Sequence, residues 1–64
     1  MDGRVWSDHF RVGLQMLLDG VHGSKTATAI DAHLLQILNA FKSGDDPHRT
    51  ADKIYQLELA ARKV

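Results

Sequence analysis

Glycine and proline divide this chain into three stretches of helical length. Gly20 and Gly23 mark the first break, and Gly44 with Pro47 marks the second; both residue types interrupt regular helices. Between the breaks, apolar residues recur every three or four positions, which is the period of an amphipathic helix. We therefore predict an all-α, three-helix domain with helices at roughly 7–21, 27–43 and 46–63.

The apolar residues of each predicted helix gather on one face. Gly13 falls inside the first apolar stripe, where glycine lowers helix stability by about 1 kcal/mol relative to alanine but lets another backbone approach closely. We therefore expect a neighbouring helix to cross at Gly13. The other stripe residues are Trp6, Phe10, Leu14, Leu17, Leu18 and Val21 in the first helix, Ile30, Leu34, Ile37 and Phe41 in the second, with Ala27, Leu35 and Leu38 widening it, and Thr50, Ile54, Leu57, Ala61 and Val64 in the third.

Residues with capping preferences mark the expected helix ends. Ser7 is a candidate N-cap for the first helix, and Thr28 begins a sequence resembling a capping box for the second. Gly44 can adopt the left-handed conformation that ends a helix, and an aspartate before Pro47 is a typical helix start. Because few residues separate the second and third helices, we expect them to form an antiparallel hairpin with the first helix lying across it.

The size of the chain limits how much apolar surface it can hide. Its 64 residues allow a single small domain, and a chain this short buries only about 60% of its unfolded surface. It contains no cysteine, and its histidines lack the spacing of a zinc site. We therefore expect no metal and no cofactor, and we expect a homodimer mate or a protein partner to cover the remaining apolar surface.

The stretch DGVHGSKTA, residues 19–27, raises the question of a phosphate-binding loop. Such a loop needs the spacing G-x-x-x-x-G-K-[ST] after a buried strand. Here Ser24 separates Gly23 from Lys25, and the preceding residues follow a helical pattern. We interpret the stretch as a turn in which Gly20 or Gly23 ends the first helix and Ser24 or Thr26 helps to start the second.

Residues that could perform chemistry are few. His48 and Asp52 are four positions apart on the third predicted helix, but no nucleophile or second base can be assigned beside them. We expect a solvated pair, no catalytic site and no small-molecule substrate. His33 lies at the rim of the second apolar face, where it could form a pH-sensitive contact if a partner covered it.

The charge and hydropathy of the chain argue against nucleic acids and membranes as partners. Eight basic and eight acidic side chains give a formal charge of zero, which removes the basic footprint typical of nucleic-acid-binding domains. No apolar run approaches the length of a membrane span, and the N-terminal residues lack the profile of a secretion signal. We therefore expect a cytoplasmic protein that binds neither nucleic acid nor membranes.

Two alternatives stay open. Ala40 and Gly44 reproduce one spacing of a helix-turn-helix DNA-binding regulator, although Asp45 and Asp46 would begin its recognition helix and repel phosphates. Residues 34–64, LLQILNAFKSGDDPHRTADKIYQLELAARKV, place apolar helices around a Gly-Asp-Asp-Pro turn. In this they resemble the short helical-hairpin co-chaperones and needle-type subunits of bacterial type III secretion, and the resemblance implies a co-chaperone or subunit role.

The favoured prediction is a small non-enzymatic module for protein–protein interaction, such as an adaptor, a chaperone-like protein or an inhibitor. Tyr55 and Leu59 form a pair four positions apart on the third helix, and Glu58 and Arg62 separate this pair from the apolar seam. Trp6 is either a core residue or an aromatic anchor for a partner. The predicted partner contacts are therefore Tyr55, Leu59, Trp6 and Arg62.

Overall fold

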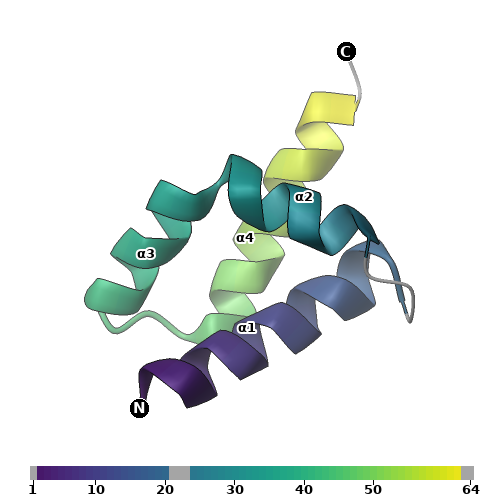
Figure 1. Ribbon diagram of the computed structural model, residues 1–64. Coiled ribbons are helices and arrows are strands. Elements are labelled where there is room, and N and C mark those ends of the chain that lie inside the picture. Colours follow the sequence, from purple (N-terminus) through teal and green to yellow (C-terminus); the bar gives the residue numbers. More distant parts are fainter. Residues whose placement is uncertain (1, 21–23, 63–64) are drawn as a thin grey trace.

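The computed structural model describes residues 2–20 and 24–62, and these residues form four helices (Figure 1). Helix α1 spans Gly3–Leu18, α2 Ser24–Ala32, α3 Leu34–Lys42 and α4 Pro47–Arg62. The described residues contain no strand. The all-α prediction is therefore confirmed, whereas the division into three helices is not.

The predicted second helix is divided by a bend at His33. This residue has φ −119° and ψ 24°, outside the helical range, and Figure 1 shows α2 and α3 as two arms that meet there. The His33 N–H donates to the Ala29 carbonyl at the end of α2, and the His33 carbonyl accepts from the Ile37 N–H at the start of α3. The bend directs Ala29 of α2 and Ile37 of α3 into the same core, so a straight helix over 27–43 is wrong.

The predicted starts of the first two helices are also wrong. Helix α1 begins at Gly3, and its N-cap is Asp2, whose carboxylate accepts from the Arg4 N–H at 2.8 Å. Ser7 lies one turn inside the helix. Helix α2 begins at Ser24, and Thr28 is an interior residue whose hydroxyl donates to the Ser24 carbonyl. Asp2 and Ser7 are both residue types that cap helices, and the structure uses Asp2.

The turn between α3 and α4 follows the sequence signals closely. Gly44 has φ +75°; its N–H donates to Phe41 and the Asp45 N–H donates to Ala40, which together make a Schellman motif. Pro47 is the first residue of α4, and the Asp46 carboxylate accepts from the His48 N–H at 2.8 Å. The predicted glycine end and aspartate–proline start are both confirmed.

Helix α4 packs mainly against α1 and only lightly against α3, and Figure 1 shows α1 crossing in front of α4. The predicted hairpin of the last two helices is therefore not the main contact. At the crossing, a Cβ atom placed on Gly13 would lie 3.4 Å from the Ala51 Cβ and from His48 Nδ1. Ala51 is fully buried. The expectation that a helix crosses at Gly13 is confirmed, and two small residues permit the approach.

One core joins all four helices. Within it the Trp6 and Phe10 rings stack with centroids 5.5 Å apart. Of the predicted stripes, Leu17, Leu34, Phe41, Leu57 and Ala61 are exposed, whereas Val21 and Val64 lie outside the described residues. The buried apolar residues are Trp6, Phe10 and Leu14 from α1, Ala29 from α2, Ile37 from α3, and Ala51 and Ile54 from α4.

The connection between α1 and α2 is held by a carboxylate. Asp19 follows the last residue of α1, and its Oδ2 accepts from the Thr26 N–H at 2.6 Å and from the Thr26 hydroxyl at 2.9 Å. Thr26 is buried. The Thr26 N–H, in the first turn of α2, is therefore already bound to the carboxylate of Asp19. Gly20, with φ +64°, follows the end of α1, as the interpretation of 19–27 as a turn requires; Gly23 lies outside the described residues.

Replacing Gly13 by leucine is expected to destabilise the fold by about 1–3 kcal/mol, because the added side chain has no room between α1 and α4. Gly13→Ala is the matched control: its Cβ meets Ala51 at ordinary contact distance, and the gain in helix propensity offsets any crowding. Urea unfolding followed by circular dichroism measures both. Equal stability of the leucine and alanine variants would contradict the close crossing.

Replacing Asp19 by alanine is expected to lower the free energy of unfolding by about 1–3 kcal/mol, because it removes the acceptor for the buried Thr26 hydroxyl. Asp8→Ala, which removes an exposed carboxylate from α1, should change stability by less than about 0.5 kcal/mol. Thermal and urea unfolding of the two variants should differ accordingly, and matching curves would refute the proposed role of Asp19.

Candidate functional site

The described residues give little support for metal binding or catalysis. They contain no cluster of three or more histidine, cysteine, aspartate or glutamate side chains placed to hold a metal ion, and every buried side-chain polar atom among them has a hydrogen-bond partner. His48 and Asp52 are exposed. The His48 ring packs edge-on against the His9 ring of α1, with centroids 5.4 Å apart. This histidine therefore belongs to the surface of the α1–α4 contact.

His33 has a partner within the chain. Its Nε2 lies 3.2 Å from Oε1 of Glu58 on α4, and the two side chains are only 23% and 20% exposed. The contact ties the bend between α2 and α3 to the second half of α4. His33 thus faces an intramolecular carboxylate, where the sequence allowed a contact with another protein.

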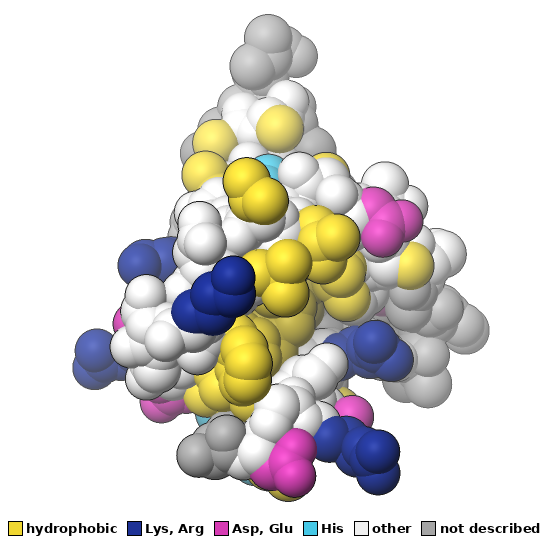
Figure 2. Space-filling view, turned by 60° about the vertical axis from the view of Figure 1, so that its left-hand side comes forward, with side chains coloured by type: hydrophobic (Ala, Val, Ile, Leu, Met, Phe, Trp, Pro, Cys, Tyr) yellow, Lys and Arg dark blue, Asp and Glu magenta, His cyan; other side chains and the backbone are white. Residues whose placement is uncertain are grey.

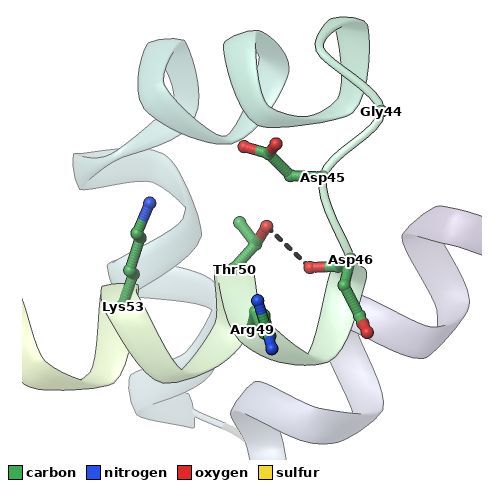
Figure 3. A pocket seen from close by; sticks show the side chains of 6 residues that line it. All are labelled: Gly44, Asp45, Asp46, Arg49, Thr50 and Lys53. Carbon is green, nitrogen blue, oxygen red and sulfur yellow. Dashed lines mark hydrogen bonds between the residues drawn. The ribbon is translucent and has the colours of Figure 1, made fainter.

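A polar hollow lies at the corner between α3 and α4, with a volume of about 520 Å³ (Figure 3). Figure 3 shows the Asp45 carboxylate and the Lys53 amino group extending over it, while the Asp46 carboxylate points away to cap α4. The Thr50 hydroxyl donates to the Asp46 carbonyl at 2.9 Å. Arg49 also lines the hollow, so acidic and basic residues both surround it, and the Asp46 carboxylate is already bound at the start of α4.

A second hollow, the α1–α3 groove, is apolar and has a volume of about 310 Å³. On the α3 side, Leu34, Leu38 and Phe41 are 49%, 44% and 37% exposed. Figure 2 shows the hydrophobic side chains of this face as a continuous band, with lysine or arginine side chains on both sides of it. The lining residues are Gly3, Trp6, Ser7, Phe10 and Arg11 of α1, Ile30 of α2, and Leu34, Ile37, Leu38 and Phe41 of α3.

One end of the groove is closed by aromatic packing. The Phe41 ring approaches to 3.2 Å of the position that a Cβ on Gly3 would occupy, and it meets the Trp6 ring edge-on with centroids 5.5 Å apart. The Trp6 indole N–H donates to the Asp45 carbonyl at 2.7 Å. The N-terminal turns of α1 are therefore fixed against the end of α3 at this end of the groove.

The structure does not bring the predicted partner contacts together. Trp6 is 5% exposed and belongs to the core, one of its two interpretations, and it forms part of the groove floor. Tyr55 and Leu59 lie two to three turns beyond the start of α4. Both are partly buried, and Tyr55 packs against the core. The side chain of Arg62 lies outside the described part of the chain. Partner binding by Tyr55, Leu59 and Arg62 stays a prediction.

The groove residues of α3 are predicted from the sequence to pack inward. The apolar period places Leu34 and Phe41 on the seam of the expected hairpin, whereas the structure leaves them exposed on the wall of the groove. The sequence carries a signal for this. Leu35 and Leu38 extend the apolar surface of this segment beyond one stripe, and a helix apolar over more than one face needs more than one neighbour to cover it.

Among the described helices, none combines the length and apolar character needed to cross a membrane. The chain was also compared with known proteins. No family model, curated protein or solved structure matches it.

Proposed function

We propose that this chain is a small non-enzymatic protein–protein interaction module that binds its partner through the α1–α3 groove. The observation that carries the proposal is the exposed apolar wall of α3 next to the apolar floor formed by Trp6, Phe10 and Ile37. Continuous apolar surface of this kind on a small domain is typical of interaction sites. An adaptor, a chaperone-like protein or an inhibitor could use such a surface.

The energetics favour a protein occupant. Full burial of a leucine or phenylalanine side chain stabilises a complex by roughly 1.5–3 kcal/mol, and Leu34, Leu38 and Phe41 each retain between a third and a half of their accessible surface. Covering them therefore adds roughly 1 kcal/mol per residue. Apolar anchors in a pocket are the usual centre of a protein interface, and this groove provides the pocket.

The DNA-binding alternative is less well supported. It requires the first turn of α4 to enter the major groove, and that turn begins at Pro47, directly after Asp45 and Asp46. Both carboxylates would face phosphates and repel them. The α3 face beside it is apolar, whereas a DNA interface is polar and positively charged. These features argue for protein over nucleic acid as the ligand.

Site-specific photo-crosslinking in the cells that produce the protein tests this proposal. A benzoylphenylalanine at position 38, in place of Leu38, should form a covalent adduct with a partner protein. The matched control is the same residue at position 56, in place of Gln56, which is exposed on α4 and should give no adduct. A third variant, at Leu59, tests the predicted contact on α4.

The pattern of adducts decides the outcome. Adducts from position 38 but not from position 56 support the proposal. Adducts from Leu59 alone would move the interface to α4 and reject the groove. The absence of protein adducts at all three positions, in a folded protein, would contradict an interaction function.

A further inference from the structure

We infer that the α1–α3 groove binds an amphipathic helix from another protein, and that this helix carries acidic residues beside its apolar stripe. The inference rests on the proposed function and adds the chemistry of the partner. Two independent features carry it: the geometry of the apolar wall, and the sign of the charges along the border of the groove.

The geometry favours a helix over an extended segment. Leu34, Leu38 and Phe41 follow at spacings of four and three, so they form one ridge about 10 Å long on the side of α3. Ser7 and Arg11 are the polar side chains among the described residues that line the groove. An extended peptide would leave many of its backbone N–H and C=O groups unpaired against these walls, whereas a helix pairs them internally.

The charges along the groove favour an acidic partner. Arg11 lines the groove and is exposed, and Arg4, seven residues earlier, lies on the same side of α1. Opposite them, α3 contains no acidic residue and ends with Lys42. Arg4, Asp8 and Lys42 stand outside the lining, so Arg11 is the charged side chain among the described residues that line the groove. The groove lining is thus basic although the chain as a whole is neutral.

The charge of Arg11 next to the apolar wall distinguishes between partner helices that carry acidic, basic or no charged residues beside their apolar stripe. Covering Arg11 with a purely apolar partner would remove water from a guanidinium without replacing its hydrogen bonds, which is unfavourable. A glutamate or aspartate at the edge of the partner's stripe would supply charge-assisted hydrogen bonds instead. A basic partner would be repelled, so the border provides specificity as well as affinity.

A second copy of the chain fits the groove less well. In a two-fold dimer through this groove, the same surface patch of both copies forms the interface. The described lining residues include Arg11 but no acidic residue, so the second copy's lining would offer Arg11 no carboxylate. We therefore assign the groove to a different protein, and self-association is one of the outcomes that the test distinguishes.

The test uses two synthetic helical peptides of about 16 residues without tryptophan. Both carry leucines at i, i+4 and i+7, and the flanking positions are glutamate in one peptide and lysine in the other. Trp6 is the single tryptophan of the chain and lines the groove, so its fluorescence reports binding. The glutamate peptide should bind about fivefold more tightly than the lysine peptide, since one ion pair contributes up to about 1 kcal/mol.

Three variants locate the binding. Arg11→Glu should reverse the preference between the two peptides. Leu38→Asp should abolish binding of the glutamate peptide. Leu35→Asp is the matched control, because Leu35 is 76% exposed on the same helix and does not line the groove; it should bind the glutamate peptide as the unmodified chain does. Circular dichroism of each variant confirms that it is folded.

Equal binding of the two peptides, binding of neither, or a preference unchanged by Arg11→Glu would overturn the inference. Sedimentation showing a dimer that Leu38→Asp dissociates would also overturn it, in favour of a second copy. The proposed function is decided separately by photo-crosslinking at position 38. A heterologous adduct there, together with no preference for the glutamate peptide, would reject the acidic helix and keep the interaction function.

Discussion

The close crossing of α1 and α4 is the contact on which the rest of the structure depends. Gly13 has no side chain and Ala51 has only a methyl group, so the two longest described helices approach closely at this point. The approach brings Leu14 and Ile54, both fully buried, into the same layer of the core. In a chain this short, two helices packed at this distance provide much of the apolar burial that a stable fold requires.

The position of the groove follows from this crossing. Because α4 packs chiefly on α1, the bent pair α2–α3 is left to cover the remaining side of α1. The chain bends at His33 and reaches the core with Ala29 and Ile37. The rest of α3 then overhangs α1 and presents its second apolar side to the outside. The ridge of Leu34, Leu38 and Phe41 stays exposed because α1, α2 and α4 do not cover this side of α3.

Local signals in the sequence predicted local features well. The aspartate–proline start and the glycine end around residues 44–47 were predicted correctly, because each is encoded by the backbone preferences of one or two residues. The crossing at Gly13 was also predicted, since a glycine within an apolar stripe weakens its helix and the close approach of a second helix offsets that loss. The apolar periodicity sufficed for the all-α class and placed Trp6, Phe10 and Leu14 on one face, while it left Trp6 open between the core and a partner contact.

Features that depend on tertiary context were not predicted. The bend at His33 contains neither glycine nor proline, so the sequence carries no local mark of it. The antiparallel hairpin failed because periodicity identifies an apolar face but not the helix that covers it. The groove was missed for the same reason. The hydrogen bonds of Asp19 were missed as well. Its partner, Thr26, lies across a turn, and the periodicity of one helix carries no information on contacts across a turn.

The indole of Trp6 couples the floor of the groove to the integrity of the α3–α4 turn. Its ring lies beneath the apolar wall, while its N–H satisfies the main-chain oxygen of Asp45. Phenylalanine could replace much of the ring volume but would leave that oxygen without its donor. Evolution therefore has little freedom to retune this part of the surface. For the proposed interaction, changes of partner would instead concentrate at the rim, at residues such as Leu34, Leu38 and Arg11, which line the groove without such an internal bond among the described contacts.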